Sequence, residues 1–248
     1  MKPFIFFLLV VAAIAEPKSF RLIEDAAVMN APANGAAVDI WTKDTRLTSN
    51  EERGALVRIT GYFPNGRWQK TTNEWWIDRK SLEDITPPAE LPRQKGAIRT
   101  ILVDKSRFTI TVTESVGKLT TVLFSTRVGL GIDECLTQDE GGRCYYTEAG
   151  TYKVEFKVYD PDGIEWCIPK SMEKEARYRK DVASGQRCFR GSLGKVALNI
   201  GKTYAIHGTS NPRSIGKRSS HGCIRVVNAD AERLFRLMRV GDPVLIVE

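Results

Sequence analysis

The chain has 248 residues, of which 42% are hydrophobic and 27% are charged. This is ordinary globular usage, so disorder over most of the length is excluded, and the length suits one or two domains. The net charge of +7 suits a polyanionic partner, yet no segment has the pattern of a nucleic-acid-binding module, so nucleic acid is not expected as a partner.

Residues 1–15 have the pattern of an export signal. Lys2 gives a positive start, residues 4–14 are an unbroken apolar run, and residues 13–15 (Ala-Ile-Ala) form a small-x-small cleavage site. The run is too short to span a bilayer, so no stable membrane span is expected after its removal. The alternative is an uncleaved anchor. We therefore expect a secreted, periplasmic protein.

The segment after the signal divides into two parts. Residues 16–36 are small, polar and alanine-rich, which predicts a spacer. Residues 37–86 contain short apolar runs separated by tight turns, including Pro-Asn-Gly at 64–66, a pattern typical of a small β-barrel. The expected strands are residues 38–41, 56–62, 67–70 and 74–77.

The order of aromatic residues in 37–86 is similar to that of a bacterial SH3-like domain. The resemblance rests on the turn followed by Trp68, then on residues 75–77 (Trp-Trp-Ile) and Leu82. It implies a module that binds cell-wall peptides or packs against a catalytic domain. The alternative is that the tryptophans are core or domain-interface residues.

A second domain is expected over residues 97–248, after a proline-rich linker at 87–96. Residues 150–159 alternate most clearly between apolar and charged side chains. One helix is expected from Asn228, as N-cap, to a stop at Gly241. The other strands are expected at residues 98–103, 107–113, 119–128, 196–200, 204–206 and 243–247. The fold class is therefore mainly β.

Five cysteines leave one thiol unpaired in an exported protein. Four of them allow three pairings, and we prefer the neighbouring pairs Cys135–Cys144 and Cys167–Cys188. Export to an oxidising compartment favours both disulfides. Cys223 is then the free thiol.

Both histidines of the chain, His207 and His221, lie within residues 207–223, a stretch that ends at Cys223. The thiolate is the nucleophilic form of cysteine, and a nearby imidazole accepts the thiol proton. Basic side chains near the stretch add positive potential: Arg213, Lys217, Arg218 and Arg225. A zinc site formed by the two histidines and Cys223 is an alternative, although the spacing matches no metal-ligand pattern.

Residues 206–208 (Ile-His-Gly) and 220–225 (Ser-His-Gly-Cys-Ile-Arg) closely resemble the signature of L,D-transpeptidase catalytic domains of the YkuD type. The resemblance covers residues 97–248 and includes residues 150–154, although residues 147–150 lack a proline typical of the family. It implies a β-sandwich-like catalytic domain with a helix in the C-terminal region.

The resemblance assigns the chemistry to five residues. Cys223 would attack a stem-peptide carbonyl, and His207 would take the thiol proton while the main-chain carbonyl of Gly208 orients its ring. His221 and Gly222, with the Cys223 amide, would shape the oxyanion environment. His221 as a purely structural residue is the alternative.

Two further residues are assigned to substrate binding. Arg225 would hold a substrate carboxylate or brace the catalytic loop. Ser220 would be a hydrogen-bond donor near the substrate or a turn residue.

The implied substrate is a peptidoglycan tetrapeptide stem, which acylates the cysteine with release of D-alanine. An amine then resolves the thioester, either from a second stem or from a wall or outer-membrane protein, and no cofactor or metal is needed. Attack by water would instead make the protein an L,D-carboxypeptidase, and a D-amino acid would give exchange. A non-catalytic wall-binding protein is the alternative from another class.

Two segments that lie between expected strands, residues 133–143 and 170–190, are expected to form lids over the site. Within the second segment, residues 171–180 are charged and predict a short helix or a mobile loop.

Overall fold

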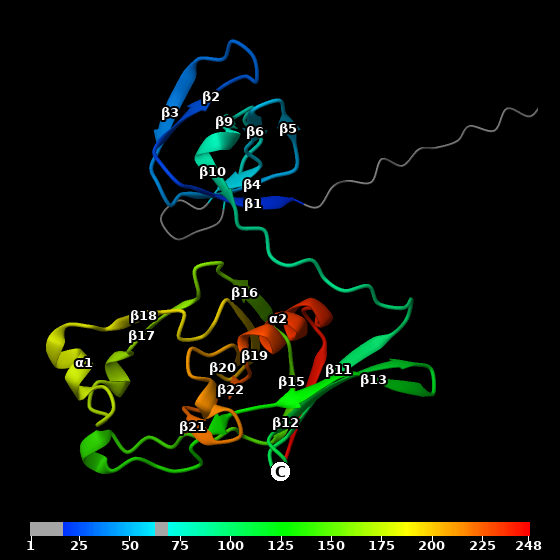
Figure 1. Ribbon diagram of the computed structural model, residues 1–248, viewed down its shortest axis with the longest axis vertical. Helices are drawn as coiled ribbons and strands as arrows, with labels where there is room; N and C mark the ends of the chain where they lie inside the picture. The colour runs from blue at the N-terminus through cyan, green and yellow to red at the C-terminus, as the bar shows by residue number, and fades with distance from the viewer. Residues whose placement is uncertain (1–16, 63–68) are drawn as a thin grey trace, which may run out of the picture. The chain divides into compact units, whose positions relative to one another are not determined.

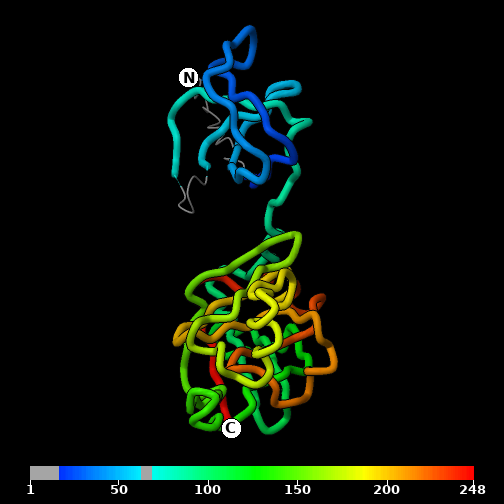
Figure 2. Tube along the Cα trace, turned by 90° about the vertical axis from the view of Figure 1, so that its left-hand side faces the viewer, coloured from blue at the N-terminus to red at the C-terminus, as the bar shows by residue number. Residues whose placement is uncertain are grey.

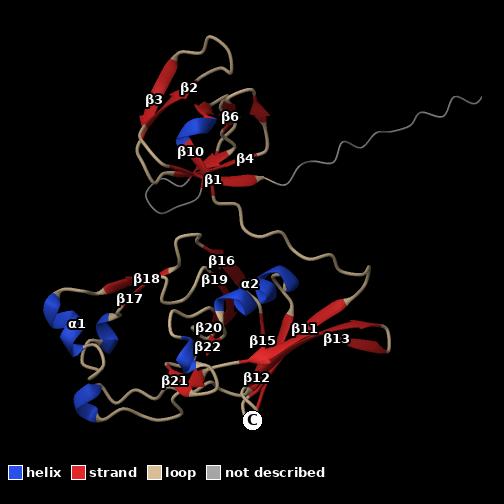
Figure 3. Ribbon diagram, viewed as in Figure 1, coloured by secondary structure: helices blue, strands red, loops and turns tan. Residues whose placement is uncertain are grey.

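The computed structural model describes residues 17–62 and 69–248. The chain divides into two compact units, Met1–Thr86 and Pro87–Glu248 (Figure 1). The expected export signal at residues 1–15 and the turn at 64–66 with Trp68 lie outside the described residues. Both units are built mostly of strands, with few helices (Figure 3), so the mainly-β fold class is confirmed.

The first unit contains two five-stranded sheets. One has the order β10 (Leu82–Asp84), β1 (Lys18–Leu22), β4 (Arg46–Ser49), β7 (Gly61–Tyr62) and β8 (Gln69–Lys70). The other has the order β3 (Ala37–Trp41), β2 (Ala26–Met29), β9 (Trp76–Asp78), β6 (Leu56–Arg58) and β5 (Glu52–Arg53). Among the described residues neither sheet closes on itself, and the SH3-like assignment stays a prediction.

The expectation of a spacer over residues 16–36 is wrong for β1 and β2. Phe20 and Leu22 alternate with polar residues and are fully buried, and β1 pairs with both β4 and β10. β1 has five residues and β2 has four, and alternation over so short a length is a weak signal, which explains the error. The expected strand at 56–62 is also divided, because the chain passes from β6 in one sheet to β7 in the other.

The aromatic residues of the first unit pack against one another. The Trp41 ring stacks on Tyr62 with centroids 4.9 Å apart, and Trp75 meets both rings edge-on. Trp76 is fully buried. These contacts favour the core alternative for the described tryptophans.

The second unit is built around a five-stranded and a four-stranded sheet. The first has the order β13 (Leu119–Arg127), β12 (Thr109–Val116), β11 (Ile98–Asp104), β23 (Pro243–Val247) and β15 (Gly150–Lys153). The second has the order β16 (Phe156–Tyr159), β19 (Val196–Gly201), β20 (Tyr204–His207) and β22 (Ile224–Arg225). One apolar core collects residues of both sheets and of helix α2 (Asn228–Leu237).

Residues 150–159 were expected as one strand and form two. The Val154 N–H donates to the Asp242 carbonyl at 2.9 Å, whereas the Glu155 N–H donates to the Asn199 carbonyl at 2.8 Å. The chain therefore leaves the five-stranded sheet and joins the four-stranded sheet at this point, and Phe156 is exposed rather than buried. Alternation along a single segment does not reveal such a change of partner.

Asn228 begins helix α2 but is not its N-cap, which is Val227. The Asn228 side chain instead accepts a hydrogen bond from the Thr209 N–H at 2.8 Å, just beyond β20. Met238, expected within the helix, is its buried C-cap. The apolar face is as expected, with Ala231 and Leu234 buried.

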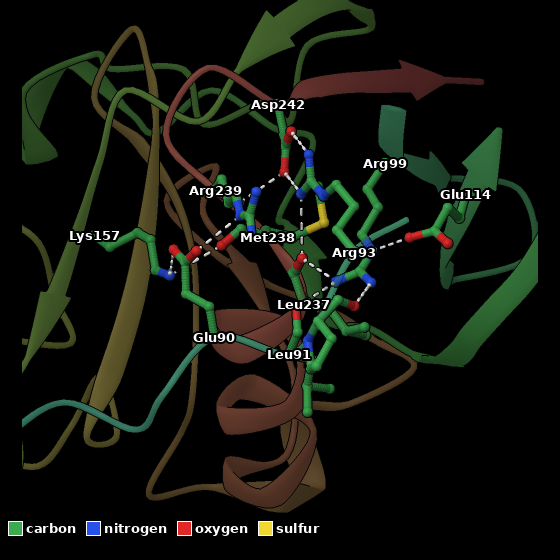
Figure 4. A network of polar contacts seen from close by, with 11 residues as sticks. Glu90, Leu91, Arg93, Arg99, Glu114, Lys157, Leu237, Met238, Arg239 and Asp242 are labelled. Atoms are coloured by element: carbon green, nitrogen blue, oxygen red, sulfur yellow. Dashed lines mark hydrogen bonds and ion pairs between the residues drawn. The ribbon is translucent and has the colours of Figure 1, made fainter. Parts of the chain in front are cut away.

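Residues 87–96, expected to be a linker, lie against the second unit (Figure 4). The Leu91 N–H donates to the Arg236 carbonyl at 2.7 Å near the end of α2. The Arg93 guanidinium makes two contacts with the buried Asp242 carboxylate, at 2.7 and 2.5 Å. Glu90 pairs with Lys157 and Arg239. The segment thus joins β15–β16 and the turn before β23 at one place.

Two segments extend from the sheets of the second unit. The disulfide loop, residues 135–144, contains a 3-10 helix (Gln138–Glu140) and is closed by Cys135–Cys144. The β17–β18 segment, residues 165–190, runs from β17 (Glu165–Cys167) through a 3-10 helix (Lys170–Met172) and α1 (Arg179–Ser184) to β18 (Cys188–Arg190), and Cys167–Cys188 joins its ends. Figure 2 views the unit from the side that carries this segment (yellow).

Both disulfides are the pairs preferred from the sequence, and Cys223 is the free thiol. They indicate an oxidising compartment. In the described part of the chain, no helix has the length and apolar character needed to cross a membrane.

Candidate active site

Cys223 follows strand β21 (Arg218–Ser220) and directly precedes β22. Its Sγ lies 3.8 Å from the Thr203 carbonyl oxygen, at the turn before β20. The thiol lines a cavity of about 720 Å³, together with His207, His221 and Arg225. The other wall of this cavity comes mainly from the β17–β18 segment, with Trp166, Pro169, Ser171, Met172, Tyr178, Asp181, Phe189 and Arg190.

Strand pairing, rather than chain proximity, brings His207 to this site. β20 and β22 are parallel neighbours, with Ile206 opposite Ile224 and His207 opposite Arg225. His207 is therefore beside the strand that begins immediately after Cys223. The sequence could not show this pairing, because a two-residue strand such as β22 has no readable period.

The His207 ring is buried, and its Nδ1 has a defined hydrogen-bond partner. Nδ1 lies 2.5 Å from the Gly208 carbonyl oxygen, the partner expected from the sequence. A carbonyl oxygen only accepts, so Nδ1 carries the proton and Nε2 keeps its lone pair. Burial lowers the pKa of His207 to about 4, against the opposing effect of the Gly208 and Leu193 carbonyls. The ring is thus a neutral imidazole near pH 7.

The Cys223 thiol is also shifted toward its neutral form. Burial raises its pKa, while a backbone hydrogen bond at Ala205 and the positive charge of Arg225 lower it. Together with the lowered pKa of His207, this favours a neutral thiol and a neutral imidazole in the free protein.

The segment from Ser220 to Cys223 is held by internal hydrogen bonds. The Ser220 hydroxyl donates to the Cys223 carbonyl at 2.6 Å and accepts from the Gly222 N–H at 3.1 Å. The Thr147 hydroxyl donates to the Gly222 carbonyl at 2.9 Å and accepts from the Gly131 N–H at 2.9 Å. Ser220 is buried, and these contacts favour a role in shaping the turn.

Two glycines of the motif are required by space. At Gly222, where φ is +117°, a Cβ would lie 2.7 Å from the Tyr146 carbonyl oxygen. At Gly208 a Cβ would lie 2.2 Å from Asn228 Oδ1. Larger side chains at either position would displace the segments that carry Cys223 and His207.

The His221 ring points to a buried carboxylate. Its Nε2 lies 2.9 Å from Glu175 Oε2, and the Tyr145 hydroxyl donates to the other oxygen of Glu175. The Tyr145 ring meets the imidazole edge-on at 4.4 Å, and the Tyr178 ring stacks on it at 5.7 Å. Burial lowers the pKa of His221, and Glu175 opposes that shift.

Four basic residues were expected near the motif. Among the residues that the structure describes, Arg225 is the one of these four that lines the cavity. Burial lowers its pKa, and its Nη1 lies 3.4 Å from Ser219 Oγ. Arg218 is turned toward Asp133 at 3.1 Å. The sequence therefore overstated how many of these four residues contribute positive charge at the site.

Three residues of the site were not predicted from the sequence: Glu175, Tyr145 and Thr147. Thr147 belongs to the turn noted for its missing proline, which was the one available signal. Glu175 lies in a charged stretch without periodicity, and nothing in that stretch separates it from its neighbours. Among the described residues, one group of side chains lies close enough together to bind a metal ion: Glu165 with the disulfide pair Cys167–Cys188. Neither histidine belongs to this group.

A free thiol, a buried imidazole and an arginine line one cavity of a β-rich scaffold. Nucleophilic chemistry at a cysteine requires a thiol and a proton acceptor near it. Residues 98–246, more than half of the chain, match the family YkuD, the L,D-transpeptidase catalytic domain. The chain belongs to this L,D-transpeptidase family.

Curated relatives carry the same family name. A protein of Escherichia coli K12 named "Probable L,D-transpeptidase YbiS" is 46% identical over 103 residues, which are 40% of this chain and 32% of that protein. The chain thus matches about a third of the length of YbiS. "Probable L,D-transpeptidase ErfK/SrfK" of Salmonella typhimurium is 46% identical over 56 residues, 23% of this chain and 18% of that protein.

Solved structures with similar folds include L,D-transpeptidase 3 from Mycobacterium tuberculosis, at 16% identity and a TM-score of 0.41, covering 78% of this chain and 91% of that chain. A fragment of the L,D-transpeptidase from Xylanimonas cellulosilytica has 20% identity and a TM-score of 0.40, with 64% of each chain covered.

Proposed function

We propose that the protein is a peptidoglycan L,D-transpeptidase that uses Cys223 as nucleophile and His207 as general base. The carrying observation is the neutral His207 ring, held at Nδ1 by the Gly208 carbonyl, on the wall of the cavity that exposes the Cys223 thiol. A thiol and an acceptor nitrogen on the wall of the same cavity can generate a thiolate when the two groups come into hydrogen-bond reach.

The first half-reaction forms a thioester. His207 Nε2 takes the thiol proton, and the Cys223 sulfur attacks the carbonyl carbon between the third and fourth residues of a tetrapeptide stem. The tetrahedral intermediate collapses as the C–N bond breaks. The protonated His207 ring gives its proton to the departing amine, which leaves as D-alanine.

The second half-reaction restores the thiol. An acceptor amine attacks the thioester carbonyl and loses a proton to His207. The C–S bond then breaks, and the thiolate recovers the proton from the imidazolium. An amine from a second stem gives a 3-3 cross-link, whereas water gives a tripeptide and defines the carboxypeptidase alternative.

The stem peptide carries carboxylates, and the cavity offers positive charge to receive them. Arg143, Arg190 and Arg225 line it, with Asp181 as the opposing charge. Arg225 is the arginine nearest in sequence to the nucleophile and is a candidate for holding a substrate carboxylate. Arg143 comes from the disulfide loop and Arg190 from the β17–β18 segment, which supports the proposal that these segments act as lids.

Export to the periplasm completes the proposal. The disulfides and the basic charge suit a secreted protein that acts on an anionic wall polymer. In the first unit, peptide binding stays a proposal that the aromatic group of Trp41, Tyr62 and Trp75 supports only weakly, because these rings are packed against one another.

The test is product analysis by mass spectrometry. Protein lacking residues 1–15 is incubated with purified tetrapeptide muropeptides, with Cys223→Ala as the control. Cross-linked dimers that have lost D-alanine support the transpeptidase, and tripeptides alone support the carboxypeptidase. Absence of any product that depends on Cys223 contradicts the proposed function.

A further inference from the structure

Glu175 is a buried carboxylate that the proposed mechanism does not use. It lies in the β17–β18 segment, between the 3-10 helix and α1, and is 1% exposed. A buried carboxylate is costly unless it is paired and hydrogen-bonded. Its partners therefore indicate what it holds in place.

Three parts of the second unit meet at this carboxylate. His221 comes from the segment that carries Cys223, Tyr145 follows the disulfide loop, and Arg177 belongs to the β17–β18 segment itself, 3.5 Å away. No other described contact joins the β17–β18 segment to the nucleophile's segment by a charged group. Glu175 thus connects a wall of the cavity to the residue two positions before Cys223.

The contact also fixes the state of the His221 ring. A carboxylate only accepts, so Nε2 must carry a proton, and in the neutral ring Nδ1 is then the acceptor. His207 is the opposite tautomer, with its proton on Nδ1. The Tyr145 and Tyr178 rings restrict the orientation of His221 from two sides.

We propose that Glu175 is a positioning residue of this active site: its carboxylate fixes the ring of His221 and, through it, the segment that presents Cys223 to the cavity. The effect on turnover rests on the proposed function, whereas the effect on the His221 ring does not. Glu175 itself does not line the cavity, so its replacement removes no side chain from the cavity wall.

The charged and titratable groups that face His221 are Glu175 and Arg177 from the β17–β18 segment, Tyr178 from the same segment, Tyr145, and Arg225 from β22. Glu175 is the one whose charge favours the protonated ring, and both arginines oppose it. Removing the Glu175 charge therefore moves the titration of His221 to lower pH.

Nuclear magnetic resonance of protein labelled with ¹⁵N-histidine tests the contact directly. The chain has two histidines, so the imidazole signals are assigned with a single His207→Gln variant. We expect opposite tautomers for the two rings in the wild type. In Glu175→Gln the His221 titration moves to lower pH and the His207 signals stay in place.

Two variants serve as controls. Glu173→Gln changes a carboxylate of the same segment that pairs with Arg187 instead, and we expect no change at His221. Tyr145→Phe keeps the Glu175 carboxylate but removes the hydrogen bond that the tyrosine hydroxyl donates to it. The carboxylate then interacts more strongly with His221, so we expect the His221 titration to move to higher pH. Because the two variants are expected to move the His221 titration in opposite directions, Tyr145→Phe still tests the contact if Glu175→Gln folds poorly.

Steady-state kinetics with tetrapeptide muropeptides then test the positioning role. We expect Glu175→Gln to lower kcat about tenfold or more and to change KM less than about threefold, because misplacement of a reacting group lowers turnover more than binding. Glu173→Gln should match the wild type in both. Unmoved His221 signals in Glu175→Gln, or a raised KM with unchanged kcat, would overturn the inference. Moved signals in a protein without transpeptidase activity would support the contact and reject the proposed function.

Discussion

Thr147 is the residue whose replacement tests the described geometry of the Cys223 segment most economically. Its hydroxyl is fully buried and makes two hydrogen bonds, to the Gly222 carbonyl and from the Gly131 N–H, each at 2.9 Å. Valine has nearly the same shape and lacks both bonding functions. Thr147→Val therefore leaves two buried backbone groups unpaired.

The expected cost follows from those two groups. Each unpaired buried polar group costs about 1–3 kcal/mol, so we expect the free energy of unfolding of the second unit to fall by about 3 kcal/mol. For a domain of this size, that corresponds to a decrease in melting temperature of about 6–12 °C. Thr147→Ser keeps the hydroxyl and should lose much less than the valine variant.

The assay is differential scanning calorimetry of the three proteins, read together with the rate of Cys223 alkylation by iodoacetamide. We expect Thr147→Val to melt lower than Thr147→Ser and to alter the alkylation rate, because the Gly222 carbonyl next to the nucleophile is released. Equal melting temperatures and equal alkylation rates in all three proteins would refute the reasoning.

Three further predictions use other parts of the site and of the second unit. Because burial raises the pKa of Cys223 above its ordinary value of 9.0, its alkylation rate should keep rising beyond that pH, and an inflection below it would contradict the account. The pKa of His207 is about 4 rather than 6.5, so the unfolded chain takes up the proton first as the pH falls. The stabilisation from the neutral ring is complete above pH 6.5 and declines toward pH 4, and urea unfolding should show about 2 kcal/mol more loss between pH 7 and 4.5 in the wild type than in His207→Gln. Arg93→Ala leaves the buried Asp242 without its guanidinium partner and should lower the free energy of unfolding by about 3 kcal/mol, whereas Lys95→Ala, at an exposed position, should not.

The sequence predicted the parts of the site that depend on residue type. Cys223 and His207 share one cavity, the Gly208 carbonyl meets the His207 ring, and both disulfides join the preferred cysteines. The odd number of cysteines indicated one free thiol, neighbouring cysteines were the preferred pairs, and the role of the Gly208 carbonyl was implied by the resemblance to the L,D-transpeptidase signature. Most strands of the second unit also lie where alternation placed them.

What the sequence did not predict depends on partners far away in the chain. Residues 150–159 alternate throughout, yet the chain changes sheets within them, because Val154 bonds to Asp242 just before β23 and Glu155 bonds to Asn199 in β19. Asn228 has the residue type of an N-cap, but its side chain bonds to Thr209 across the fold. Glu175 meets His221 through a segment without periodicity. Such contacts are set by tertiary packing, which overrides local preference.

The central claim is that Cys223 becomes acylated by a tetrapeptide stem. The most direct measurement is intact-protein and peptide mass spectrometry after brief incubation with tetrapeptide muropeptide and acid quenching. The account predicts an adduct equal to the stem minus D-alanine, on the peptide that contains Cys223, absent in Cys223→Ala and formed more slowly in His207→Gln. Turnover of the stem with no adduct on Cys223, or with an adduct on another residue, would contradict it.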